Sequence, residues 1–221
     1  DESFLLVSDL FYFLSVLQND VIRLTAQGAI YKQQQRQILK GFMVPEEPLE
    51  QKGPRFGFGR MYHLYPDRFS LLYDYGYYRG YFCEKEGILC LTAQGSGKIN
   101  KTNQEIEAEQ IYRFWIRLYR RPIPHLPMLV RWIGVLAKVH WYPLPVLYRA
   151  IQDWLTPFYY ESEASLFQKI IRMLVHLGVL QCGEEEKEIF VKLTTTGAKW
   201  IQGISIFREK EIEESFMRCR I

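Results

Sequence analysis

Apolar residues recur with the spacing of an α-helix in several segments that are separated by turn residues. This recurrence predicts helices over residues 3–17, 29–39, 68–75, 102–119, 128–139, 145–155 and 162–177, and over a last helix from 194 through 200. Short apolar and β-branched runs, bounded by Gly, Asn and Asp, predict strands over 21–23, 81–83, 88–91, 179–182 and 188–193. We therefore expect a mainly α fold with small β wings, in the α+β class.

A five-residue motif punctuates this pattern. Leu-Thr-Ala-Gln-Gly occurs at 24–28 and at 91–95, and the looser copy Leu-Thr-Thr-Thr-Gly occurs at 193–197. Each copy follows a predicted strand, so its Thr hydroxyl can cap a following helix, and its Gly lets that helix approach the sheet closely. Internal repeats are strong fold signals, so we expect tandem winged-helix-like units in which the three copies occupy equivalent places.

The segment 128–204 carries the fullest pattern. Three predicted helices are followed by a strand, a charged turn, a second strand and a capped helix, which is the order of a winged helix. Gly178 is expected to close the third helix. The predicted domains are N-terminal winged-helix-like units over 1–100 with a Pro- and Gly-rich loop at 41–60, a connecting helix and Pro-rich turn over 101–127, a winged helix over 128–204, and a helical tail over 205–221.

Several stretches resemble a known family. Residues 6–17 (Leu-Val-Ser-Asp-Leu-Phe-Tyr-Phe-Leu-Ser-Val-Leu) and 21–32 (Val-Ile-Arg-Leu-Thr-Ala-Gln-Gly-Ala-Ile-Tyr-Lys) resemble winged-helix segments of the bacterial XPB-type helicase N-terminal region. Residues 176–180 and 191–200 are similar to a later unit of that family and also to many MarR-like wings. The resemblance implies a part of a larger helicase or DNA-repair-type protein. The chain departs from a complete helicase because it has no Walker A motif and no recognisable acidic Mg²⁺ motif.

Composition narrows the class of protein. Hydrophobic residues make up 48% and charged residues 24% of the 221 residues, which excludes general disorder, and a net charge of +3 does not by itself indicate nucleic-acid binding. The four cysteines form no CxxC, so we expect reduced, mostly buried thiols in a cytoplasmic protein. We expect no membrane association, because no apolar run approaches the length of a span. The start at Asp1, without an initiator Met, suggests a piece of a longer protein.

No catalytic, metal or cofactor site is predicted. The segment Gly95-Ser-Gly-Lys98 lacks the upstream Gly and the following Ser or Thr of a phosphate loop. His63, His125, His140 and His176 are too scattered to form a metal pair or a nucleophile–base pair. We therefore expect a protein that is not an enzyme.

Two basic stripes are the candidate binding residues. Lys32, Arg36 and Lys40 recur every fourth residue, so they share one helical face. A second stripe contains Arg113, Arg117, Arg120 and Arg121, interleaved with Tyr112, Phe114, Trp115 and Tyr119. Cations beside aromatic rings suit a nucleic-acid backbone or a single strand. The alternative for the second stripe is a structural one: acidic residues begin this helix and arginines end it, which complements the helix dipole.

The predicted wing of the 128–204 segment points away from conventional DNA reading. Residues 184–188 are Glu-Glu-Glu-Lys-Glu, four acids and one base, which repel phosphate. Two functions remain open. The first is a module that binds DNA weakly and with little sequence preference through the basic stripes. The second is an adaptor that uses the acidic wing to bind a protein partner or further domains of its parent chain.

Overall fold

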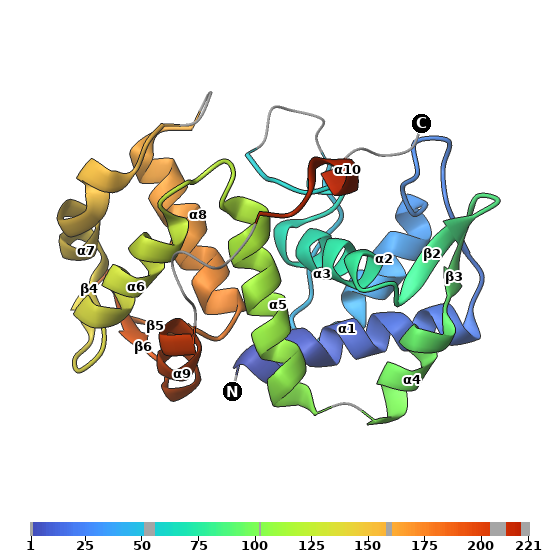
Figure 1. Cartoon of the computed structure of the whole chain (residues 1–221), viewed down its shortest axis with the longest axis horizontal. Helices are drawn as coiled ribbons and strands as arrows, with labels where there is room; N and C mark the ends of the chain where they lie inside the picture. Colours follow the sequence, from blue (N-terminus) through green and yellow to red (C-terminus); the bar gives the residue numbers. More distant parts are fainter. Residues whose placement is uncertain (1, 51–55, 102, 158–160, 204–210, 218–221) are drawn as a thin grey trace. The chain divides into compact units, whose positions relative to one another are not determined.

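The computed structural model describes residues 2–50, 56–101, 103–157, 161–203 and 211–217 (Figure 1). The chain divides into two compact units. The N-terminal unit contains Phe4–Ile111 and Glu213–Ile221, and the C-terminal unit contains Tyr112–Ile212 and Asp1–Ser3. The division falls within one helix, α5 (Gln104–Tyr119). The finer domain boundaries drawn from the sequence stay predictions.

The N-terminal unit alternates helices with a small antiparallel sheet. Its elements are α1 (Glu2–Asn19), β1 (Ile22–Arg23), α2 (Lys32–Lys40), α3 (Asp67–Tyr78), β2 (Phe82–Lys85), β3 (Ile88–Leu91), α4 (Ala93–Lys101), the first part of α5, and the short α10 (Glu214–Met217). The strands lie in the order β1-β3-β2. The hairpin β2–β3 and its two-residue turn form a small wing (Figure 1).

The C-terminal unit repeats this order. Its elements are the rest of α5, α6 (Leu126–Leu136), β4 (Tyr142–Pro143), α7 (Leu144–Ile151), the 3-10 turn η1 (Gln152–Trp154), α8 (Glu163–His176), β5 (Leu180–Glu185), β6 (Glu188–Leu193) and α9 (Thr195–Gly203). The strand order β4-β6-β5 matches that of the first sheet. Helix, strand, helix, helix, hairpin, helix therefore occurs twice. This confirms the predicted α+β fold with small β wings.

Aromatic side chains fill the core of the N-terminal unit. Phe13 of α1 makes edge-to-face contacts with Phe69 of α3 (5.2 Å between ring centroids) and with Phe82 of β2 (5.5 Å). Tyr73 of α3 packs on the same Phe82 at 5.0 Å. These rings join the first helix, the third helix and the hairpin, and such pairs add about 0.5–1.5 kcal/mol each beyond the apolar area they bury.

The second and third Leu-Thr motifs make matching contacts. Thr92 donates to the carbonyl of Gly80 (2.6 Å) and accepts from the amide of Gly95 (3.1 Å), which starts α4. Thr194 donates to the carbonyl of Gly178 (2.7 Å) and accepts from the amide of Gly197 (2.8 Å), which starts α9. Gly80 and Gly178 have φ of 68° and 72° and close the preceding third helices. The Thr caps therefore tie the end of the third helix to the start of the fourth.

The motif glycines sit where a side chain has no room. A Cβ on Gly95 would lie 2.0 Å from the carbonyl oxygen of Tyr81, and one on Gly197 would lie 2.3 Å from that of Val179. Because the obstructing atoms are backbone, a side chain cannot be accommodated by rotating a neighbour. The predicted close approach is confirmed for these two copies.

The first copy is different, and the predicted equivalence of all three is wrong. Leu24 does follow β1, but residues 25–28 form a reverse turn in which the amide of Gly28 donates to the carbonyl of Thr25 (2.9 Å). Gly28 has φ of 75° and nothing within 4 Å of a Cβ. No hairpin lies between the end of α1 and this copy, and the Thr25 hydroxyl accepts from the amide of Ala29 (3.2 Å).

Gly197→Ala is expected to lower the free energy of unfolding by about 1–3 kcal/mol through overpacking, as measured by urea unfolding. Gly95→Ala should act similarly on the N-terminal unit. Gly97→Ala is the matched control, because Gly97 lies in α4 with nothing within 4 Å of its Cβ. That change should stabilise the helix by about 0.5–1 kcal/mol. Equal effects at Gly97 and Gly197 would contradict the close approach.

Candidate functional site

The first basic stripe lies on the exposed face of α2. Lys32, Arg36 and Lys40 are all exposed, whereas Gln35, Ile38 and Leu39 are buried on the opposite face. The helix contains no acidic residue. Within the described chain none of the three cations forms a hydrogen bond or ion pair. We call these three residues the α2 stripe.

Helix α2 is anchored to the sheet at the end that carries Lys32. The Gln34 side chain accepts from the amide of Arg23 (3.1 Å) and donates to the carbonyl of Val21 (2.9 Å). Beside it is a shallow hollow of about 520 Å³, which is lined by Arg23, Tyr31, Lys32, Gln33 and Gln34. Tyr31 is 51% exposed there. A planar, partly exposed ring beside two cations is suited to contacting a nucleic-acid strand.

The second stripe is less accessible. Arg113, Arg117 and Arg120 are half-buried and only Arg121 is exposed. Arg113 donates to the carbonyl of Gly203 (3.3 Å), and each of the four arginines has an intramolecular interaction. The interleaved Tyr112, Phe114 and Trp115 are buried, with Tyr112 stacked on Trp200 at 5.5 Å. These three rings therefore belong to the core and offer no surface for base stacking.

The third helices of the two units differ in exposure. Every residue of α3 from Arg68 to Gly76 is buried. Part of this burial comes from the segment that precedes the helix. In that segment Glu46 accepts from the amides of Arg68 (3.2 Å) and Phe69 (2.9 Å), and the Arg60 guanidinium lies 3.7 Å from the Tyr77 ring centre. By contrast, α8 exposes Gln168 and Arg172. A buried α3 cannot enter a DNA groove in the manner of a recognition helix.

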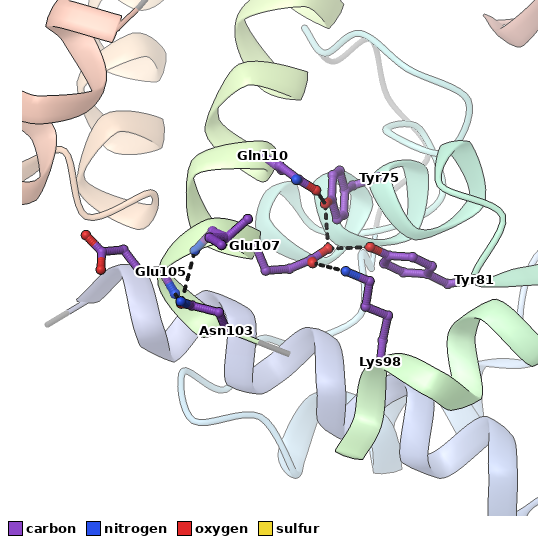
Figure 2. Close-up of polar contacts among 8 residues, drawn as sticks. Tyr75, Tyr81, Lys98, Asn103, Glu105, Glu107 and Gln110 are labelled. Atoms are coloured by element: carbon purple, nitrogen blue, oxygen red, sulfur yellow. Dashed lines mark hydrogen bonds and ion pairs between the residues drawn. The ribbon is translucent and has the colours of Figure 1, made fainter. Parts of the chain in front are cut away.

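A buried carboxylate joins α3, α4 and α5 of the N-terminal unit with Tyr81, the residue just before β2 (Figure 2). Glu107 of α5 accepts hydrogen bonds from the hydroxyls of Tyr75 and Tyr81 (2.5 Å each) and from the ammonium of Lys98 in α4 (2.8 Å). Its side chain is fully buried, and that of Lys98 is 26% exposed. Burial alone would raise the pKa of Glu107, but the hydrogen bonds from Lys98 and the two tyrosines outweigh it and lower the pKa. Glu107 is therefore held as a carboxylate, and Lys98 serves as its counter-ion in α4.

A second buried pair connects α1 with α3. Asp9 and Arg68 form a salt bridge with side-chain exposures of 0% and 1%. The other oxygen of Asp9 accepts from the amide of Met43 (2.5 Å). Neither this pair nor the Glu107 cluster was predicted from the sequence. Two features of the sequence could have indicated these contacts. Asp9, Arg68 and Glu107 are charged residues on the apolar faces of their helices, and Lys98 ends the Gly95–Lys98 segment that superficially resembles a phosphate loop.

The start of the helix predicted over 102–119 is only partly covered by the structure. Thr102 lies outside the described residues. Asn103 accepts from the amide of Glu105 (3.0 Å) and so caps α5 (Figure 2).

The cysteines are less buried than expected. Cys83 and Cys182 are exposed and Cys90 is half-buried, so the expectation of mostly buried thiols is wrong. The two exposed ones lie on β2 and β5, each at one edge of its sheet. Cys83 and Cys90 are free thiols although they face each other across the hairpin. Cys219 lies outside the described residues.

Searches for similar proteins returned no match among protein-family models, curated proteins or solved structures. In the described part of the chain, no three His, Cys, Asp or Glu side chains are grouped so that they could bind a metal ion. None of the helices described here combines the length and hydropathy needed to cross a membrane.

Glu107→Gln is expected to lower the free energy of unfolding by about 2–3 kcal/mol, because it removes a charge that three donors satisfy. Tyr81→Phe should cost about 1–2 kcal/mol. Glu47→Gln, at an exposed position of the same unit, is the control and should have little effect. Urea unfolding monitored by circular dichroism measures all three. A Glu107→Gln protein as stable as the parent would show that the cluster contributes nothing to folding.

Two other carboxyls have pKa values that are shifted upward, in the opposite direction to the pKa of Glu107, so they should change the stability with pH. Burial raises the pKa of Glu46 to about 7 and that of Asp74 to about 7. A carboxyl with a raised pKa binds its proton more readily in the folded chain, so its contribution to stability is complete below the unfolded pKa and is lost as pH rises through about 7.

Asp74→Asn should therefore gain stability relative to the parent as pH increases from about 5 to about 8. Urea unfolding of both proteins across this range measures the difference. The comparison with the parent also removes the opposing contribution of His63, whose pKa is lowered by burial. A difference that stays constant with pH would contradict the assignment to Asp74.

Proposed function

We propose that this chain is a non-catalytic winged-helix module that binds the nucleic-acid backbone through the α2 stripe. The observation that carries the proposal is the exposed face of α2, where Lys32, Arg36 and Lys40 have no acidic neighbour on the helix and no ion pair in the described chain. Cations that are not already neutralised can exchange their counterions for phosphates.

The binding should be weak, salt-sensitive and tolerant of sequence. Three cations neutralise few phosphates, and phosphate contacts carry no base information. The buried α3 has no face for reading bases in the N-terminal unit. In the C-terminal unit, the acidic residues beside α8 repel the backbone. Support for specific base recognition is therefore lacking in both units.

The arginines of α5 are the second part of this proposal. Arg121 is exposed, and Arg113, Arg117 and Arg120 keep part of their surface in solvent. Because each also has an intramolecular interaction, we expect a smaller contribution from them than from the α2 stripe. The resemblance to the XPB-type helicase N-terminal region supports a place in a larger, cytoplasmic helicase or DNA-repair-type protein, with any motor outside this chain.

Replacing Lys32, Arg36 and Lys40 together by Ala should weaken binding to single- and double-stranded DNA. For duplex DNA, the slope of log K against log salt falls by about 0.9 for each lost phosphate contact, so the triple variant should lose about 2–3 in slope. Fluorescence anisotropy across a salt series measures both quantities. The matched set replaces Arg113, Arg117 and Arg120 by Ala and should have a smaller effect.

Glu184–Glu186→Gln serves as the control for charge alone, and should leave DNA binding unchanged or slightly stronger. If the α2 variant binds as the parent does while Lys169→Ala and Arg172→Ala abolish binding, the C-terminal unit binds DNA conventionally and the proposal is wrong. Absence of DNA binding at low salt would favour the adaptor function, which is supported by the exposed acidic wing.

A further inference from the structure

A groove of about 590 Å³ opens in the C-terminal unit between α7, α8 and the tip of the β5–β6 hairpin. Its apolar lining consists of Leu144, Pro145, Tyr148, Ala164, Phe167 and Ile189. Tyr148 and Phe167 pack against each other at 5.2 Å, and Ile189 is 43% exposed. Exposed apolar surface that is concave and bordered by polar residues is typical of an interaction site.

The border of the groove on the hairpin side is acidic. Glu184, Glu185, Glu186 and Glu188 are exposed, and in the described chain none of them forms an ion pair. Glu186 and Glu188 line the groove, whereas Glu185 does not. We call Glu184, Glu186 and Glu188 the wing-tip acids. Glu184 lies directly opposite Ile189 in the register, so its side chain is on the same face as this apolar wall. Lys187 is the one cation within the 184–188 turn.

Several residues at the tip of the β5–β6 hairpin lower the local stability of the hairpin. Glu185 and Glu188 face each other directly across the hairpin, an arrangement of like charges that destabilises a strand pair. Glu186 and Lys187 have φ of 49° and 68°, where residues with a Cβ are disfavoured. A bound cation would relieve the repulsion between the two carboxylates.

The corresponding hairpin of the N-terminal unit is not built this way. Its Glu84 is 3.5 Å from the Arg60 guanidinium and accepts from the hydroxyl of Tyr73 (3.1 Å). Gly87 occupies the second turn position, with φ of 75°. The N-terminal turn has one unpaired acid, Glu86, with φ of 52°. The group of four acids and the pairing of Glu185 with Glu188 are found in the C-terminal wing alone among the described residues, so the shared fold does not require them.

We propose that the groove binds a basic amphipathic segment of a partner protein. An apolar side chain of the partner lies among Leu144, Tyr148 and Ile189, and its flanking lysines or arginines lie over the wing-tip acids. Nucleic acid does not fit, because the acids repel phosphate. The α2 stripe of a second copy fits poorly, since the apolar face of α2 is already buried in its own unit. This surface is independent of the α2 stripe.

The test uses a short synthetic peptide of leucine and lysine at helical spacing, and a second peptide in which glutamate replaces every lysine. Isothermal titration of the whole chain should show saturable binding of the lysine peptide only. Glu184, Glu186 and Glu188 replaced together by Gln should weaken that binding about tenfold, because each lost charge pair at an exposed site contributes modestly. Ile189→Ala should weaken it about threefold to tenfold through lost apolar contact.

Two matched variants control for charge and for apolar surface elsewhere. The first control variant removes three exposed acids from the N-terminal unit by replacing Glu47, Glu50 and Glu86 with Gln. The second, Val139→Ala, shortens a side chain that is 66% exposed in the C-terminal unit. Both variants should bind the lysine peptide as the parent does. Circular dichroism confirms that all variants are folded.

Three results would overturn the proposal: no saturable binding of the lysine peptide, equal binding of both peptides, or equal losses in the test and control variants. Sedimentation equilibrium gives a fourth. If the chain alone forms a dimer that Ile189→Ala dissociates, a second copy occupies the groove instead. Loss of DNA binding by the α2 variant with unchanged peptide binding would separate this proposal from the proposed function.

Discussion

Each unit depends on one close contact between a helix and the residue just before a neighbouring strand. The glycine of the Leu-Thr motif brings the first turn of the fourth helix against a backbone carbonyl, at Tyr81 in one unit and Val179 in the other. The preceding Thr binds the carbonyl that ends the third helix. This contact therefore connects the end of the third helix, the start of the hairpin and the first turn of the fourth helix. In the N-terminal unit it also brings α4, and with it Lys98, within reach of Glu107.

The sequence was sufficient for those parts of the fold that depend on neighbouring residues. Helical periodicity, the hairpins and the glycine at 178 that closes the third helix were all predicted, because each is set within a few residues. The motif at 24–28 shows where this ends. Its five residues are identical to those at 91–95, yet they form a turn, because no hairpin brings Thr25 back to the end of the preceding helix as β2 and β3 bring Thr92.

Features that join distant segments were not predicted. Asp9 and Arg68 are 59 residues apart, and nothing in either local sequence indicates the partner. The burial of α3 owes part to Glu46 and Arg60, which lie in a segment whose proline and glycine content predicts irregular backbone without saying where it packs. For the candidate site, the spacing of Lys32, Arg36 and Lys40 correctly placed three cations on one exposed face. The same reasoning could not foresee that the aromatic neighbours of the α5 arginines would be core residues.

The two units share an element order but present different surfaces. The N-terminal unit carries a basic, exposed α2 and hides its third helix; the C-terminal unit leaves its third helix exposed beside an acidic hairpin. The same topology therefore carries a basic surface in one unit and an acidic surface in the other. This is possible because outward-facing side chains can differ without disturbing the Thr and Gly contacts inside. These opposite charges are the physical basis for assigning a different kind of ligand to each unit.

The turn at Glu186-Lys187 has a consequence for how the folding landscape of the C-terminal unit is shaped. In a minimally frustrated sequence, local preferences agree with the global fold. A sequence optimised only for folding would place Asn-Gly or Asp-Gly at this turn, and would not set Glu185 against Glu188. At the hairpin tip, the local preferences of the residues therefore conflict with the fold, whereas the rest of the unit is well packed. Conflicts of this kind are expected where residues are chosen for what they contact and not for how the chain folds.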